Sequence, residues 1–157
     1  MKRPWNLANI PVYSLATYDG GQVNMNICTY VSAVSMSPKR YMVAVYHNTQ
    51  SLNNIEQSDT AVLQLLGKQH LGLVNVLGKK SGKNYNKEKY LTKRKQLEIW
   101  DDKLVLSNCA AWVKLEKRWA KEAGDHTIFL FDVNGFKTNH NNLLMLDDLR
   151  ENKLVRI

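Results

Sequence analysis

The stretch "HNTQS", His47 to Ser51, places several hydrogen-bonding side chains directly after an apolar, β-branched run. A helix pattern begins within it, and Thr49 or Ser51 can cap that helix. A helix N-terminus presents unpaired N–H groups and about half a positive charge. Hydroxyl and amide donors beside such a terminus predict a binding site for a phosphate group. Plain N-capping is the alternative interpretation, but it leaves His47, Asn48 and Thr49 without a role.

Small and hydroxyl-bearing residues also interrupt the strand-like run "NICTYVSAVSM", at Thr29, Ser32 and Ser35. Such positions allow a flat ligand to approach the backbone, whose N–H and C=O groups can then bond it. A strand with one polar face would show the same alternation, so both interpretations stay open at this point.

Several familiar site motifs are missing from the sequence. No G-x-G-x-x-G follows a predicted strand, which argues against a Rossmann dinucleotide site. "GKKSGKN", residues 78–84, resembles a phosphate loop, but its glycine spacing is one residue short, and Asn84 replaces the Ser or Thr that binds magnesium. There is no G-x-S-x-G elbow and no H-E-x-x-H. The four histidines lie far apart in the sequence, so we expect no metal site.

The charge of the chain is strongly basic, with a formal net charge of +8 and a pI near 9.5. Such a balance favours anionic partners, whether nucleic acid, acidic lipid or a phosphorylated small molecule. Eight basic residues and one acidic residue fall between Lys79 and Lys95. A solvated loop is the alternative to nucleic-acid binding there. Because base stacking needs interleaved aromatics and this block has only Tyr85 and Tyr90, nucleic-acid binding is the least favoured hypothesis.

Most of the secondary structure expected to position the candidate site residues is β-strand. We expect strands at residues 11–18, 27–36, 40–47, 60–66, 110–119 and 126–133, with two short ones at 142–146 and 154–157. In 110–119 the alternation places Val113 and Leu115 on one face and Trp112, Lys114 and Glu116 on the other. Helices are predicted after Ser51, at 68–78 and at 147–152. Many short strands with few helices predict a mainly β fold closed into a barrel.

Length and cysteine usage set the broad class. The 157 residues predict a single domain, 1–157, that can bury a sizeable core. Two cysteines, Cys28 and Cys109, are too few for a disulfide framework and indicate a reduced compartment. The basic start lacks the apolar region of a secretion signal. No apolar run approaches the ~18 residues that span a bilayer, so we expect a cytoplasmic protein that does not enter a membrane.

From about Pro11 to Val133, the sequence resembles the flavin reductase-like, FMN-binding split-barrel family, in its flavoredoxin-like branch. Residues 29–38, "TYVSAVSMSP", are similar to the strand and turn that line the isoalloxazine ring, and residues 47–55, "HNTQSLNNI", to the phosphate loop. Residues 77–91 resemble the S-G-K/R…D-K-[FY] segment, with residues 86–89 in the region of the D-K pair. Residues 124–133 match the G-D-H that opens a late strand.

The resemblance implies a six-stranded Greek-key split β-barrel with a few short helices. It implies a homodimer with FMN near the subunit interface, and electron transfer from NADH or NADPH to flavin. An FMN-binding electron carrier without significant NAD(P)H activity is the alternative, and a nucleic-acid-binding small barrel is the third hypothesis. Residues 141–157 replace the aromatic, glycine-bearing tail common in the family, which bears on how nicotinamide reaches the flavin.

The family match also implies cofactor-binding roles. The residues expected to border the isoalloxazine are Thr29, Tyr30, Val31 and Ser32. The residues expected to hold the ribityl-phosphate end are His47, Asn48, Thr49 and Ser51. Lys83 and Lys89 are the expected phosphate partners, each acting as a point charge.

Asp125 and His126 are the expected catalytic pair. His126 can donate to the reduced flavin or help place the nicotinamide, and Asp125 can orient the imidazole or simply form the turn. A structural histidine at the start of a strand is the alternative. We further expect Trp112 and Trp119, on a strand with one polar face, to contribute to the homodimer contact.

Overall fold

In the computed structural model, which describes residues 1–155, seven strands form one antiparallel sheet in the order β2-β1-β5-β8-β9-β4-β3. These strands are β1 (Tyr13–Asp19), β2 (Gln22–Met25), β3 (Val31–Met36), β4 (Lys39–Tyr46), β5 (Thr60–Leu65), β8 (Ala111–Ala123) and β9 (His126–Thr138). A separate hairpin consists of β6 (Leu97–Trp100) and β7 (Lys103–Leu106). The helices are η1 (Pro4–Asn6), α1 (Gln50–Gln57), η2 (Lys68–Leu73), α2 (Val74–Lys79), α3 (Lys87–Lys93) and α4 (Leu146–Glu151).

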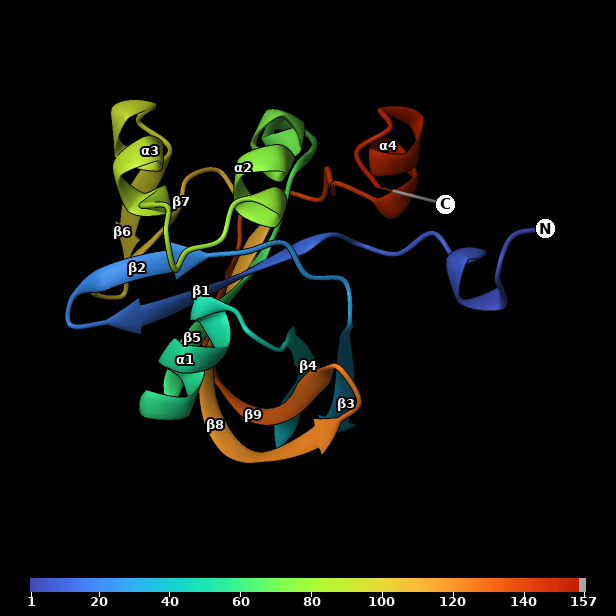
Figure 1. Cartoon of the computed structure of the whole chain (residues 1–157). Helices are drawn as coiled ribbons and strands as arrows, with labels where there is room; N and C mark the ends of the chain where they lie inside the picture. The colour runs from blue at the N-terminus through green and yellow to red at the C-terminus, as the bar shows by residue number, and fades with distance from the viewer. Residues whose placement is uncertain (156–157) are drawn as a thin grey trace.

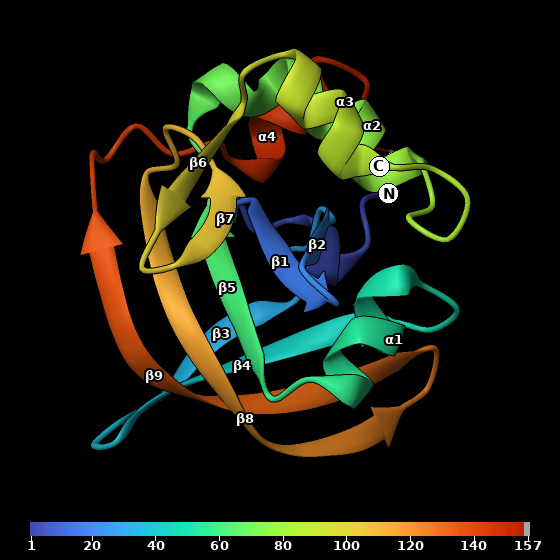
Figure 2. The ribbon, with the colours of Figure 1, turned by 90° about the vertical axis from the view of Figure 1, so that its left-hand side faces the viewer.

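The large sheet is strongly curled, as Figure 2 shows. One hydrophobic core fills its inner side. The segment between β2 and β3 joins the two ends of the sheet. Tyr13 and Cys28 exchange two backbone hydrogen bonds of 2.9 and 2.8 Å, and the Tyr30 carbonyl accepts from the Ala44 amide at 2.9 Å. The result is a split barrel of the predicted mainly β class, built from seven strands and an added hairpin rather than six strands.

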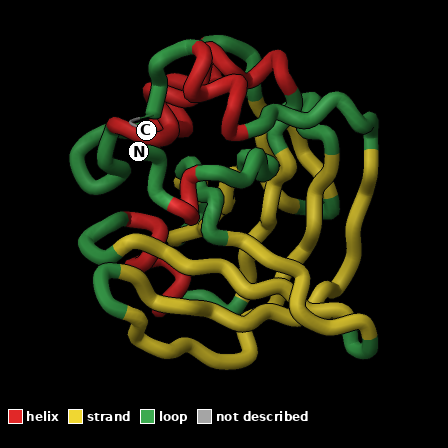
Figure 3. The backbone as a smooth tube through the Cα atoms, turned by 90° about the vertical axis from the view of Figure 1, so that its right-hand side faces the viewer, coloured by secondary structure: helices red, strands yellow, loops and turns green. Residues whose placement is uncertain are grey.

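The first core fills the inside of the barrel. Its buried members are Leu15, Val43, Val45, Ile55, Ala61, Leu63, Val113, Leu115, Phe129 and Phe131. Because side chains alternate along a strand, these positions recur at every second residue, and the alternation predicted for Val113 and Leu115 is confirmed. Figure 3 shows most helices gathered beside the strands rather than among them.

A second core covers the outer face of β1, β5 and β8 beneath α2, α3, α4 and the β6–β7 hairpin. In Figure 1 these three helices lie above β1 and β2, and α1 lies below them. Trp112 belongs to this core, is 2% exposed, stacks on Trp100 and donates from Nε1 to the Leu106 carbonyl at 3.1 Å. The expectation that Trp112 lies on a polar face and contributes to a dimer contact is therefore wrong, because the hairpin covers that face.

Most predicted elements are confirmed in type, with boundaries shifted by a few residues. One strand prediction is wrong: within 142–146 only Leu143 and Met145 form isolated bridges, with Gly67 and Pro11, before α4 begins. The strand predicted at 27–36 is confirmed as β3 but starts too early, since within 27–30 only Cys28 forms an isolated bridge, with Tyr13. The predicted strand at 154–157 lies partly outside the described residues, and residues 154–155 form no strand. The sequence patterns did not reveal β2, α3 or the β6–β7 hairpin.

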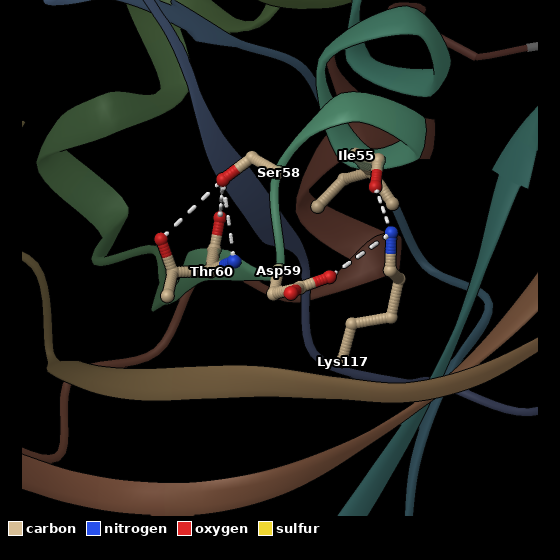
Figure 4. Close-up of polar contacts among 5 residues, drawn as sticks. All are labelled: Ile55, Ser58, Asp59, Thr60 and Lys117. Atoms are coloured by element: carbon tan, nitrogen blue, oxygen red, sulfur yellow. Dashed lines mark hydrogen bonds and ion pairs between the residues drawn. The ribbon is translucent and has the colours of Figure 1, made fainter.

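Helix α1 closes one end of the barrel and is held at both of its ends. Thr49 caps the start, where its Oγ1 accepts from the Leu52 amide at 3.2 Å. At the far end, Figure 4 shows Lys117 of β8 donating to the Ile55 carbonyl at 2.6 Å and lying 3.5 Å from the Asp59 carboxylate. A cation at a helix C-terminus is favourable because of the helix dipole. These contacts fix the direction in which the N-terminus of α1 points.

No helix within residues 1–155 has the length and apolar character needed to cross a bilayer.

Candidate functional site

A cavity of about 520 Å³ lies where the end of β4, the start of α1, the segment after β2 and the loop after α2 meet. This volume falls within the range of small-molecule binding sites. The predicted site residues that line it are Thr29, Tyr30, Asn48, Thr49, Ser51 and His126. The fold therefore brings His126 to the residues between Thr29 and Ser51, although a long stretch of chain separates them.

The hydroxyl groups at the start of α1 have different capacities for a ligand. Thr49 Oγ1 accepts from the Leu52 amide and donates its only proton to the Tyr46 carbonyl at 2.8 Å, so it has no proton left for a ligand. Ser51 is 1% exposed, and its Oγ accepts from Asn24 Nδ2 at 3.1 Å. A hydroxyl that accepts one bond keeps its own proton, so Ser51 can donate into the cavity.

Asn48 occupies the turn before the helix, with a left-handed φ of 59° that asparagine tolerates well. Its Oδ1 accepts from Lys83 Nζ at 2.7 Å, across the rim of the cavity. Lys83 does not line the cavity itself, but this bond holds its ammonium beside the N-terminus of α1. The predicted proximity of Lys83 to the phosphate end is thus consistent with the structure.

Lys87 is a buried cation in the wall of the cavity, which the exposed Lys79 and Lys80 also line. It is 5% exposed, and its Nζ donates to the carbonyls of Met25 at 2.8 Å and Leu77 at 2.7 Å. Burial lowers the pKa of its ammonium to about 8. Within residues 1–155 it forms no ion pair with a carboxylate. A buried cation without an anionic partner is costly, so an anionic ligand group beside it would be favoured.

Lys89 occupies a different place from the one expected. It lines a separate shallow depression with Gly21, Gln22 and Lys93, and it is not brought to the cavity. Residues two apart in a helix point in nearly opposite directions, so a helix that turns Lys87 toward the cavity turns Lys89 away. Lys87 and Leu91 are the buried residues of α3 and mark its inward face. Their spacing of four residues is the signal in the sequence that could have identified this face.

His47 is also absent from the cavity lining. Its Nε2 lies 3.1 Å from Thr127 Oγ1, and its backbone amide donates to the Asp125 carbonyl at 2.9 Å. These contacts join the end of β4 to the start of β9. The geometry therefore gives His47 a structural role in place of the expected contact with the phosphate end.

The other end of the cavity carries His126 between two exposed aromatic rings. The ring centroids of Tyr30 and Tyr46 lie 5.2 and 5.3 Å from that of His126. Asp125 Oδ1 lies 2.6 Å from His126 Nδ1, and this hydrogen bond lowers the pKa of the Asp125 carboxyl. The carboxylate and the two rings fix the orientation of the imidazole.

Val31 and Ser32 lie just beyond this end, in an adjoining shallow hollow of about 460 Å³ that also includes Asp125. Tyr30, Ala44 and His126 line both spaces. The two hollows are therefore continuous across the strand ends. A planar ring that rests on the small residues Thr29 and Ala44 would have His126 at its edge.

Three residues with clear roles in the geometry were not assigned from the sequence: Asn24, Tyr46 and Lys87. Asn24 lies in β2, a strand that the sequence patterns did not predict. Tyr46 ends a correctly predicted strand, but only its register with His126 in the β4–β9 pair shows that the two rings meet. Lys87 was hidden within a block of lysines whose helix was not predicted.

The chain is a split β-barrel with a cavity at its edge that lysines border. These features define a protein that binds a small anionic ligand. The model of the flavin reductase like domain family matches residues 7–151, and the chain belongs to this family.

Solved structures with this fold include a flavin reductase, an FMN-binding protein and a flavoredoxin. Flavin reductase PheA2 is 21% identical, with a TM-score of 0.74 over 88% of this chain and 85% of that one. The FMN-binding protein from Thermus thermophilus is 15% identical, with a TM-score of 0.76 over 88% and 75% of the two chains. Flavoredoxin from Methanosarcina acetivorans is 16% identical, with a TM-score of 0.76 over 92% and 77%. A comparison with curated proteins gave no significant match.

Proposed function

We propose that this protein is a flavin reductase that binds FMN in the cavity and transfers electrons from NADH or NADPH to flavin. The observation that carries the choice of FMN is the buried ammonium of Lys87, which has no carboxylate partner within the described chain. Ser51, the N-terminus of α1 and Lys83 lie on the same side of the cavity and add donors for a phosphate. Membership of the flavin reductase family supports the reaction.

The residues present fit a flavin in both of its parts. The phosphate end supplies hydrogen-bond donors and positive charge, and the ring end supplies small residues flanked by aromatic side chains. A bound flavin supplies the hydride-accepting chemistry, while the chain supplies binding, orientation and local charge. Thr29 and Tyr30 would border the ring, and His126 would present Nε2 at its edge.

Within the described part of the C-terminal tail, residues 139–155 leave the ring end of this site open. Leu144 and Leu149 are fully buried in the second core, and the backbone of Leu144 bonds to Val12 and Leu66. No residue from 139 to 155 lines the cavity. This arrangement favours the reductase over the carrier without NAD(P)H activity, since a nicotinamide ring can reach the space beside His126.

We expect the protein to bind FMN about ten- to a hundredfold more tightly than riboflavin. Charge-assisted hydrogen bonds to a phosphate contribute about 1.5–3 kcal/mol each, and riboflavin lacks that group. Calorimetry on the ligand-free protein measures both affinities. Equal affinity for the two flavins would contradict the phosphate site. A visible spectrum of the FMN complex, followed by anaerobic addition of NADH and then NADPH, tests the electron transfer.

We also propose that two copies associate through the outer face of β4, β8 and β9 next to the site. The strand register places Met42, Leu130 and Trp119 in one row on this face, and Trp119 is 48% exposed. An apolar row beside an open cavity suits a two-fold contact that shields a bound ring from water.

Light scattering at micromolar protein with FMN present is expected to give twice the chain mass of 18.1 kDa. Trp119→Glu is expected to yield the monomer, because it introduces a charge into the apolar row. Phe136→Glu is the matched control, since Phe136 is also an exposed aromatic residue, at 73%, but lies at the far end of β9. A wild-type protein that stays monomeric would exclude the dimer.

A further inference from the structure

The lysine-rich block of the sequence forms an exposed basic surface along the loop after α2 and along α3. Its members are Lys79, Lys80, Lys83, Lys89, Lys93, Arg94 and Lys95, all of them exposed. None of these seven side chains forms an ion pair with a described carboxylate. The only acid in the block, Glu88, directs its carboxylate to the Val23 amide at 2.7 Å. Seven cations against this single carboxylate leave the basic surface with a large net positive charge.

Several cations elsewhere on the chain do have carboxylate partners. Arg40 and Arg118 share Asp132 at 2.7 and 3.1 Å, and Lys114 lies 2.6 Å from Asp101. These three cations therefore have carboxylate partners, whereas the seven cations of the basic surface form no ion pair with a described carboxylate. An uncompensated group of like charges produces a positive potential that extends about a Debye length, roughly 8 Å at physiological salt.

The basic surface begins at the cavity and leads away from it. Lys79 and Lys80 line the cavity, and Lys83 bonds Asn48 at its rim. Helix α3 starts at Lys87 in the cavity wall and carries the remaining cations outward. Figure 2 shows α2, the loop and α3 next to one another on this side of the molecule.

The aromatic rings within the basic surface are already occupied. Tyr85 and Tyr90 pack together with centroids 6.3 Å apart, Lys80 lies over Tyr85, and Arg94 lies 3.9 Å from the centroid of Tyr90. Proteins that bind single-stranded nucleic acid stack bases on free aromatic rings. The geometry therefore disfavours nucleic acid as the partner of this surface.

We propose that the basic surface captures anionic nucleotides, FMN and NADH or NADPH, and steers them into the cavity. This inference rests on the proposed function, because it concerns how ligands reach that same site. Charge of one sign around the mouth of a cleft raises the local concentration of oppositely charged ligands and increases association rates by about 10- to 1,000-fold. The effect acts on association and leaves dissociation almost unchanged, since Lys89 and Lys93 lie outside the cavity.

The test compares two charge-reversed variants by stopped-flow quenching of FMN fluorescence. One is Lys89→Glu/Lys93→Glu on the basic surface, and the control is Lys2→Glu/Lys39→Glu elsewhere. Each lowers the formal net charge from +8 to about +4. At low ionic strength we expect the association rate constant of the first variant to fall about five- to tenfold and that of the control to fall less than about twofold. The difference should disappear near 0.5 M salt because of screening.

Two results would overturn the proposal. Equal association rates in the two variants would mean that only net charge matters, and a loss confined to the dissociation rate would place these lysines in the binding site itself. Calorimetry on the wild-type protein separates these outcomes from failure of the proposed function. A wild-type protein without measurable FMN affinity would exclude both the function and the steering.

Discussion

Replacing Lys87 with methionine is expected to raise the dissociation constant for FMN by about ten- to a hundredfold, with riboflavin affinity changed by less than about threefold. The ammonium is the buried charge of the cavity wall, and a charge-assisted bond to phosphate contributes about 1.5–3 kcal/mol. Methionine has a similar length but removes the charge. Calorimetry with both flavins measures the two effects on the same variant.

The pH dependence of FMN binding gives a second measurement of the same residue. Burial lowers the pKa of Lys87 to about 8 in the free protein, and a bound phosphate favours the charged form and raises that pKa. FMN affinity should therefore be nearly constant just below pH 8 and decrease by up to about tenfold per pH unit above it. Lys87→Met should abolish this decrease.

The stability of the ligand-free protein should change with pH in the opposite sense. The pKa of Lys87 is depressed from 10.5 to about 8 on folding, so the unfolded chain binds more protons between these two values. The free energy of unfolding contributed by this residue therefore increases as pH rises from about 8 toward 10.5. Denaturant melts at several pH values measure this slope, which Lys87→Met should remove.

Lys89→Met is the matched control for Lys87→Met, because it makes the same change two residues further along α3 on the opposite side of the helix. It is expected to leave equilibrium FMN selectivity over riboflavin unchanged. Lys87→Met also leaves the Met25 and Leu77 carbonyls without their donor, so its melting temperature should be recorded. Unchanged FMN selectivity in a folded Lys87→Met protein would exclude Lys87 as a phosphate partner.

The sequence identified the class of the fold because the strongest strand signals belong to the longest paired strands. β4, β5, β8 and β9 carry alternating apolar residues that fill the barrel, so their periodicity was readable without the structure. β2 and the β6–β7 hairpin are strands of four residues, too short for periodicity to distinguish them from loops. The missed hairpin also explains the wrong prediction for Trp112. This residue was expected on an exposed face because Trp100 of β6, which stacks on it, was not recognised as part of a strand.

The site was predicted in part for a similar reason. Positions close in the sequence to a recognisable motif, such as Thr49 and Ser51 at the start of α1 and His126 at the start of β9, line the cavity, and Asp125 is hydrogen-bonded to His126 beside it. Positions that depend on which way a helix turns its side chains were missed. To decide which of Lys83, Lys87 and Lys89 faces the cavity, one must know at which residue α3 starts. Asn86 caps that helix by accepting from the Lys89 amide, and this cap places Lys87 at the first helical position.

Replacing His126 with alanine is expected to slow NAD(P)H-dependent flavin reduction by about ten- to a thousandfold. This is the range found when one hydrogen-bond donor to developing negative charge is removed. The contact between Asp125 Oδ1 and His126 Nδ1 leaves Nε2 as the ring nitrogen available to a bound flavin. FMN affinity should change only slightly, because the phosphate end lies on α1 and α3. Single-turnover reduction under anaerobic conditions measures the rate.

Two further variants separate the role of His126 from the integrity of the strand start. Asp125→Asn keeps the size of the side chain but removes its charge, and we expect a smaller loss of rate than in His126→Ala. His47→Ala is the matched histidine control, since His47 bonds Thr127 outside the cavity and should affect stability more than rate. Unchanged turnover of His126→Ala with FMN bound would make His126 structural. A His126→Ala protein that loses both FMN binding and its fold would show that His126 is needed for the structure at the start of β9. A wild-type protein that binds FMN but accepts no hydride from either nicotinamide would leave the electron carrier as the function.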